Sequence, residues 1–152
     1  MRFSRLPRTF AVIAFSLFCW LSQSSLADTA TAIKQAVPDI EKVVIQVSDN
    51  DPAKWNLVLN NARNIQQDLG ENKVDIEIVA FGPGIGMLKF ESPVAGRIDD
   101  ALRAGIRIVA CQNTMKAQKL SREDMLGNIG YVPAGVVELI RKQREGYAYL
   151  RP

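Results

Sequence analysis

Two kinds of segment alternate along most of this chain, and their order limits the folds that it can adopt. Runs rich in β-branched residues predict strands at 42–48, 74–81, 106–111, 129–133 and 147–150. Between them, apolar residues spaced three or four positions apart predict helices at 52–69, 94–104 and 135–144, with further helical turns at 87–90 and after 113. Strands that alternate with helices favour a parallel sheet, because each helix returns the chain to the start of the next strand. We therefore expect an α/β three-layer sandwich, with a largely parallel sheet of about five strands and helices on both faces.

Local signals at the helix ends support this division. Asp51-Pro52 and Ser92-Pro93 each combine a capping residue with a proline suited to the first helical turn. Asn113-Thr114 can cap the helix after the third strand, and Ser121 with Asp124 resembles a capping box. In the last helix, we expect the apolar side chains of Val136, Leu139 and Ile140 to face inward.

Residues 1–27 have the features of a secretory signal peptide. Three arginines and no acidic residue precede an apolar run at 10–21, which is followed by small residues before Asp28. The run is about 12 residues long, whereas a membrane span needs about 20. We expect cleavage near Ala27/Asp28, a periplasmic location and no membrane association after cleavage. Residues 28–41 then form a lead-in segment, and residues 42–152 form the α/β domain.

Composition excludes several classes of function. Removal of the three arginines leaves 16 Lys and Arg against 16 Asp and Glu, so no basic surface for nucleic acid is expected. The chain has no histidine, which excludes the usual Ser-His-Asp and Cys-His catalytic arrangements. Cleavage would also remove Cys19 and leave Cys111 alone, so neither an intramolecular disulfide nor a structural zinc site is expected. We expect no metal and no cofactor.

Cys111 lies where ligands usually bind in an open α/β sheet, beyond the carboxyl end of a strand. The loops 48–51, 81–86 and 111–114 all leave this edge. A helix is expected directly after Cys111, and the backbone N–H groups at a helix start favour thiolate over thiol. This placement suits a nucleophilic or sulfur-carrying cysteine. An inert cysteine that packs the end of a strand is the alternative.

Two further patterns each allow two interpretations. The glycine-rich loop at 82–86 lacks the third glycine of a dinucleotide fingerprint, because Met87 occupies that position. Its glycines therefore indicate a tight turn, or close approach to a small ligand or a neighbouring subunit. Asn56, Asn60, Asn61 and Asn64 lie on one helix, although asparagine is a poor helix former. They indicate a solvated face or a hydrogen-bonding subunit interface.

Taken in order, several segments of residues 42–152 resemble the DsrE/DsrF-like family of small α/β proteins. The similar segments are Lys54-Trp55-Asn56, Leu59-Asn60-Asn61-Ala62, Val79-Ala80-Phe81-Gly82-Pro83-Gly84, Ser92-Pro93-Val94-Ala95, Val109-Ala110-Cys111-Gln112-Asn113-Thr114 and Val132-Pro133-Ala134-Gly135-Val136-Val137-Glu138-Leu139. The resemblance implies a five-stranded sheet and assembly into homo-oligomers, often trimers or hexamers. Characterised relatives are cytoplasmic and pass sulfane sulfur as a cysteine persulfide.

By this resemblance, the sulfur-carrying cysteine is Cys111, and Asn113 and Thr114 belong to its motif. Gly82, Pro83 and Gly84 are the further candidates for substrate binding. Gln112 stands where many relatives have glycine. The resemblance implies a sulfur-relay protein whose partners are a second copy of itself and a sulfur donor or acceptor, and the signal peptide adds the periplasmic location. The alternative is a non-catalytic homo-oligomeric binding module in which Cys111 is structural. A reductase-like enzyme is a weaker third interpretation, because no second thiol is present to resolve a disulfide.

Overall fold

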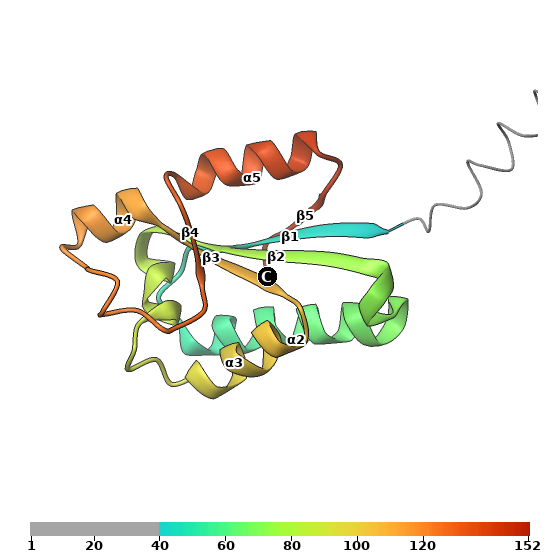
Figure 1. The fold of residues 1–152 in the computed structure, drawn as a ribbon, viewed down its shortest axis with the longest axis horizontal. Helices are drawn as coiled ribbons and strands as arrows, with labels where there is room; N and C mark the ends of the chain where they lie inside the picture. The colour runs from blue at the N-terminus through green and yellow to red at the C-terminus, as the bar shows by residue number, and fades with distance from the viewer. Residues whose placement is uncertain (1–39) are drawn as a thin grey trace, which may run out of the picture. The chain divides into compact units, whose positions relative to one another are not determined.

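Five parallel strands form a single sheet in the order β4-β3-β2-β1-β5 in a computed structural model that describes residues 40–152 (Figure 1). The strands are β1 (Glu41–Val47), β2 (Val74–Ala80), β3 (Arg107–Cys111), β4 (Gly130–Val132) and β5 (Ala148–Leu150). The helices are α2 (Pro52–Leu69), α3 (Ala95–Arg103), α4 (Gln112–Ala117) and α5 (Gly135–Arg144), with 3-10 helices η1 (Glu71–Lys73) and η2 (Gly82–Leu88). The five expected strands and the three longer helices are therefore confirmed, with small shifts at their ends.

The helices form layers on both faces of this sheet. Figure 1 shows α2 and α3 below the sheet and α5 above it, while α4 lies at the end where the strands finish. The start of α2 follows its sequence signal, since the Asp51 carboxylate accepts a hydrogen bond from the Ala53 N–H (2.9 Å) and proline follows it. The expected α/β sandwich with helices on both faces is confirmed.

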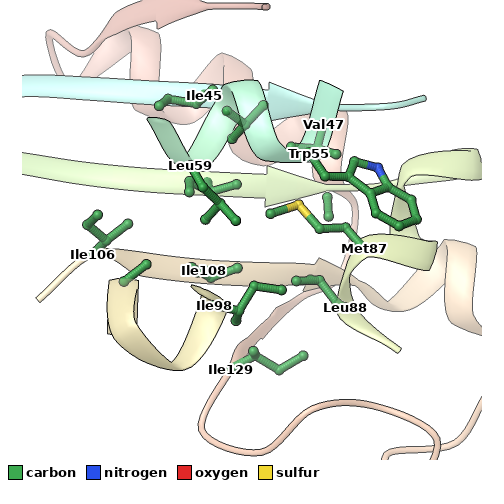
Figure 2. Packing of buried hydrophobic residues seen from close by; sticks show 14 of the residues in the cluster. Ile45, Val47, Trp55, Leu59, Met87, Leu88, Ile98, Ile106, Ile108 and Ile129 are labelled. Carbon is green, nitrogen blue, oxygen red and sulfur yellow. The ribbon is translucent and has the colours of Figure 1, made fainter. Parts of the chain in front are cut away.

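Most of the buried apolar side chains lie between the sheet and the layer of α2 and α3. Figure 2 shows Ile45, Ile108 and Leu59 in this cluster, together with Met87 and Leu88 of η2. Trp55 packs among them, and its indole N–H donates to the Asp49 carbonyl oxygen at 2.8 Å. A smaller cluster lies under α5 and consists of Val44, Val79, Val109, Val132, Leu139 and Tyr147. The face under α5 therefore has fewer apolar contacts.

Local structure differs from the sequence expectation at the glycine-rich segment. Residues 82–88 form the 3-10 helix η2, whereas a loop at 82–86 and a helical turn at 87–90 were expected. Gly84 explains the compact form, because a Cβ placed there would lie 2.4 Å from the Val47 carbonyl oxygen. Glycine lets this segment pack directly on the backbone at the end of β1.

Two expected helix caps are also corrected. Helix α4 begins at Gln112 with Cys111 as its N-cap residue, so Asn113 and Thr114 lie inside the helix and do not cap it. The Asp124 carboxylate accepts hydrogen bonds from the N–H and hydroxyl of Ser121 (2.7 and 2.9 Å), but a turn follows, with no helix. A capping-box pattern can thus close a turn by itself.

The asparagines of α2 have a role within the chain. The Asn60 side-chain oxygen accepts from the Arg97 guanidinium of α3 at 2.6 Å, and the Asn56 side-chain oxygen accepts from the same group. These two residues join α2 to α3, and Asn60 and Asn64 are exposed, as expected for a solvated face.

The signal peptide expected at 1–27 and most of the lead-in at 28–41 lie outside the described residues. Within residues 40–152, the helices are too short or too polar to cross a membrane.

Candidate functional site

Three strands bring their following segments together at one edge of the sheet. The Phe81 N–H donates to the Val47 carbonyl oxygen (3.1 Å), which joins the end of β2 to the end of β1. The Gly82 N–H donates to the Thr114 hydroxyl oxygen (2.9 Å), which joins the start of η2 to α4. The Gln118 side-chain amide donates to the Gly82 carbonyl oxygen (3.2 Å) and strengthens the same connection.

Cys111 is the last residue of β3 and lies at this edge. Its side chain is only 4% exposed. The Thr114 hydroxyl and the backbone N–H groups of Gly135, Thr114 and Asn113 lower the pKa of its thiol, and the Asn113 N–H also donates to the Pro133 carbonyl oxygen (3.1 Å). Asn113 and Thr114 belong to the first turn of α4, and Gly135 is the first residue of α5. Two helices therefore direct their N-terminal N–H groups toward one thiol.

These donors favour the thiolate. Burial raises the pKa of the Cys111 thiol, but the hydrogen bonds from Thr114, Gly135 and Asn113 outweigh it and hold that pKa below its ordinary value. A thiolate gains more from an N–H or O–H donor than a neutral thiol does, because it accepts these bonds with a full charge. The direction of the shift is the one that the sequence predicts.

Gly135 is a site residue that the sequence analysis missed. A Cβ placed on it would lie 2.9 Å from the Phe81 Cβ, so glycine allows α5 to start close to the end of β2. That approach places its N–H beside Cys111, 24 positions earlier in the chain. The available signal was a glycine at the predicted start of a helix, directly after Pro133-Ala134.

Of the other predicted site residues, some lie at the site of Cys111 and others do not. Thr114 lies beside Cys111, and Gly82 is connected to the site through its hydrogen bond to the Thr114 hydroxyl. Asn113 is exposed, and its backbone N–H donates to the Pro133 carbonyl oxygen at 3.1 Å. Pro83 is exposed, and Gly84 is buried against the end of β1. The structure thus brings Thr114 and the Asn113 backbone to the cysteine, and Gly82 to Thr114.

Replacement of Thr114 by valine is expected to raise the pKa of Cys111. Valine keeps the β-branched shape but cannot donate to the sulfur, and it leaves the Gly82 N–H without its acceptor. The pH dependence of iodoacetamide alkylation measures the pKa directly.

Thr114→Ser is the matched control for this change, since it keeps the hydroxyl. We expect its alkylation profile to stay near that of the wild type. Equal profiles for the valine variant and the wild type would show that the hydroxyl does not act on the thiol.

In the part of the chain that the structure describes, no three His, Cys, Asp or Glu side chains lie close enough together to hold a metal ion.

Comparison with solved structures supports the fold. MTH1491 from Methanobacterium thermoautotrophicum, a protein of unknown function, is 34% identical with a TM-score of 0.70, and the match covers 74% of this chain and 99% of that one. BT1422 from Bacteroides thetaiotaomicron, also of unknown function, is 18% identical with a TM-score of 0.59, over 74% of this chain and 95% of that one. The second likeness shows the fold alone.

Among curated proteins, nothing matches the chain. A family model does match, over residues 41–152, which include the whole sheet and all of the residues around Cys111. The chain therefore belongs to the DsrE/DsrF-like family.

Proposed function

We propose that this protein carries sulfane sulfur as a persulfide on Cys111. At the level of the family, membership associates the chain with sulfur relay. The observation that carries the proposal is the set of donors around the thiol, namely the Thr114 hydroxyl and the backbone N–H groups of Gly135 and Thr114. The same donors that stabilise a thiolate can stabilise the terminal sulfur of a persulfide, which is also an anion.

The chemistry needs no group beyond the thiolate and a sulfur donor. With thiosulfate, the Cys111 thiolate attacks the sulfane sulfur, a new S–S bond forms on Cys111, and sulfite leaves with the electron pair of the broken S–S bond. An acceptor thiolate then attacks the outer sulfur, takes it and releases the Cys111 thiolate. The Cys111 thiolate and the Cys111 persulfide anion each carry one negative charge, so the charge of the site is the same before and after each step.

Burial of the thiol limits the size of the sulfur donor that can reach it. Because the Cys111 side chain is 4% exposed, we expect small species such as thiosulfate or polysulfide to load it. The proposal includes the export expected from residues 1–27, so that the donor and acceptor are periplasmic.

Intact-mass analysis of the purified protein after exposure to thiosulfate or polysulfide tests the proposal. One added sulfur increases the mass by about 32 Da, and a thiol reductant removes it. A protein whose mass does not change would support the alternative, a binding module with a structural cysteine.

Self-association is the second part of the proposal, and the outer face of α5 supports it. Val136, Val137 and Ile140 lie at neighbouring positions on this face and are 52%, 59% and 49% exposed. Inward placement was expected for Val136 and Ile140, and the structure corrects this, since only Leu139 of the three is buried. We propose that the apolar face of α5, defined by these three exposed residues, contacts another copy in a trimer or hexamer.

Val137→Glu is expected to convert the oligomer into monomers, because it places a charge in the middle of this face. Light scattering at micromolar concentration measures the change. Leu57→Glu is the control, since Leu57 is also exposed but lies on α2, and we expect it to leave the oligomer intact. A monomeric wild type, or an oligomer that tolerates Val137→Glu, would count against this face.

A further inference from the structure

Two buried carboxyl groups, one from each side, lie between helix α5 and the sheet. Glu77 of β2 is 3% exposed and Glu138 of α5 is 4% exposed. Both carboxyl groups contact the same ammonium, since the Lys142 Nζ lies 3.5 Å from the Glu77 Oε2 and 3.9 Å from the Glu138 Oε1. Acidic side chains are rarely buried to this extent, because an ionised carboxylate loses its hydration there.

The oxygens of Glu77 have unequal partners. Its Oε2 accepts from the Arg107 guanidinium at 3.0 Å and lies 3.5 Å from the Lys142 ammonium. Its Oε1 is buried and has no hydrogen-bond partner among the described residues. Two ionised carboxylates can only accept hydrogen bonds, so they cannot satisfy each other. One proton changes this, because it makes one group a donor and the other an acceptor.

The charges around the pair leave one carboxylate in excess. Ion pairs connect four acidic residues with three cations in this group. The acidic residues are Asp75, Glu77, Glu138 and Glu145, and the cations are Arg107, Arg141 and Lys142. Lys42 of β1 also lies nearby, but its ammonium donates to the Glu145 carbonyl oxygen (3.4 Å) and lies over the Tyr147 ring.

We propose that Glu77 holds a proton at neutral pH and donates it to the Glu138 carboxyl group, and that this hydrogen bond fastens the first turns of α5 to β2 and β3. The hydrogen bond between the two groups then joins the helix to the centre of the sheet, where apolar contacts are few. This inference is independent of the sulfur chemistry. It does concern the same helix, because Gly135, which donates to Cys111, lies three residues before Glu138.

The acids around Arg107 differ in the direction of their pKa shifts. Burial raises the pKa of Glu77, and the Glu138 carboxyl raises it further against the opposing effects of Arg107 and Lys142. Burial also raises the pKa of Asp75, but hydrogen bonds from Tyr147 and Arg107 outweigh it, so that pKa lies below its ordinary value. Asp75 and Glu77 thus contact the same guanidinium, and only Glu77 favours the protonated form.

Glu77→Gln tests the proposal because glutamine resembles the protonated acid. Its amide oxygen can accept from Arg107, and its amide N–H can donate to Glu138. We expect the variant to keep the wild-type Tm at pH 7. A raised pKa makes a carboxyl destabilising as pH rises from its unfolded value, about 4.3, through its folded value. We expect this part of the pH dependence of Tm to disappear in the variant.

Asp75→Asn is the matched control on the same strand. Its lowered pKa means that the ionised form stabilises the fold at neutral pH, and that this contribution is lost on acidification. We expect it to lower the Tm at pH 7 by roughly 5 °C, the order expected for one charge-assisted hydrogen bond. A Glu77→Gln variant that loses as much Tm as Asp75→Asn would overturn the proposal, because Glu77 would then act as a carboxylate.

A spectroscopic measurement on the wild type avoids dependence on how well the variants fold. Infrared difference spectra of protein labelled with ¹³C-carboxyl glutamate should contain a protonated-carboxyl C=O band at pH 7. We expect Glu138→Gln to remove this band and Glu145→Gln, at the exposed end of the group, to keep it. A wild-type spectrum without the band at pH 7 would overturn the proposal.

Discussion

Cys111→Ser is expected to abolish the sulfur adduct completely while it preserves the fold. Serine is nearly isosteric with cysteine and can accept hydrogen bonds from the same donors, so α4 and α5 should start where they do now. Its hydroxyl is not ionised near neutral pH and does not form a persulfide. In intact-mass spectra after thiosulfate treatment, the wild type should gain about 32 Da and the variant should gain nothing.

Asn113→Ala is the matched control in the same segment. Asn113 lowers the pKa of Cys111 through its backbone N–H, which also donates to the Pro133 carbonyl oxygen (3.1 Å), and alanine keeps that group. We therefore expect this variant to load sulfur as the wild type does. A mass increase that persists in Cys111→Ser would assign the adduct to another group, whereas loss of loading in Asn113→Ala would show that its amide side chain takes part.

Gly84→Ala is expected to be the most destabilising of the small substitutions. The added Cβ would lie 2.4 Å from the Val47 carbonyl oxygen and 2.8 Å from the Ser48 nitrogen, both of which are backbone atoms at the end of β1. Backbone within a parallel sheet yields less easily than a flexible side chain, so we expect a loss of about 3 kcal/mol in the free energy of unfolding. Urea denaturation followed by Trp55 fluorescence measures it.

Gly96→Ala carries the same chemical change with the opposite expected sign. No atom lies within 4 Å of a Cβ at this position, which is in the first turn of α3. Alanine should stabilise the helix there by up to about 1 kcal/mol. Equal unfolding midpoints for the two variants would show that the approach of η2 to β1 contributes little to stability.

The sequence predicts the central strands and the long helix because their local signals agree. The β-branched runs of β1, β2 and β3 occur between helical segments, and Asp51-Pro52 marks the start of α2. Local signals fail where a partner distant in sequence decides the structure. Gly82-Pro83-Gly84 has the composition of a loop, and it becomes a 3-10 helix because it packs on the end of β1.

The contribution of helix α5 to the site could not be predicted, for the same reason. Cys111 and the residues directly after it could be placed from the sequence, because they follow one strand. The Gly135 N–H could not, since its approach depends on packing against Phe81. Charged residues on a strand normally indicate a solvated face, and Glu77 does not follow this rule because α5 covers it with Glu138.

Pairing of the last strand with the first has a consequence for the order of folding. Val43, Val44 and Ile45 of β1 pair with Ala148, Tyr149 and Leu150 of β5, so this contact closes a loop of roughly 100 residues. Strands β1, β2 and β3 can pair from segments close in sequence, whereas one edge of β1 stays open until β5 is available. During synthesis from the N-terminus, the sheet therefore stays incomplete until β5 has emerged.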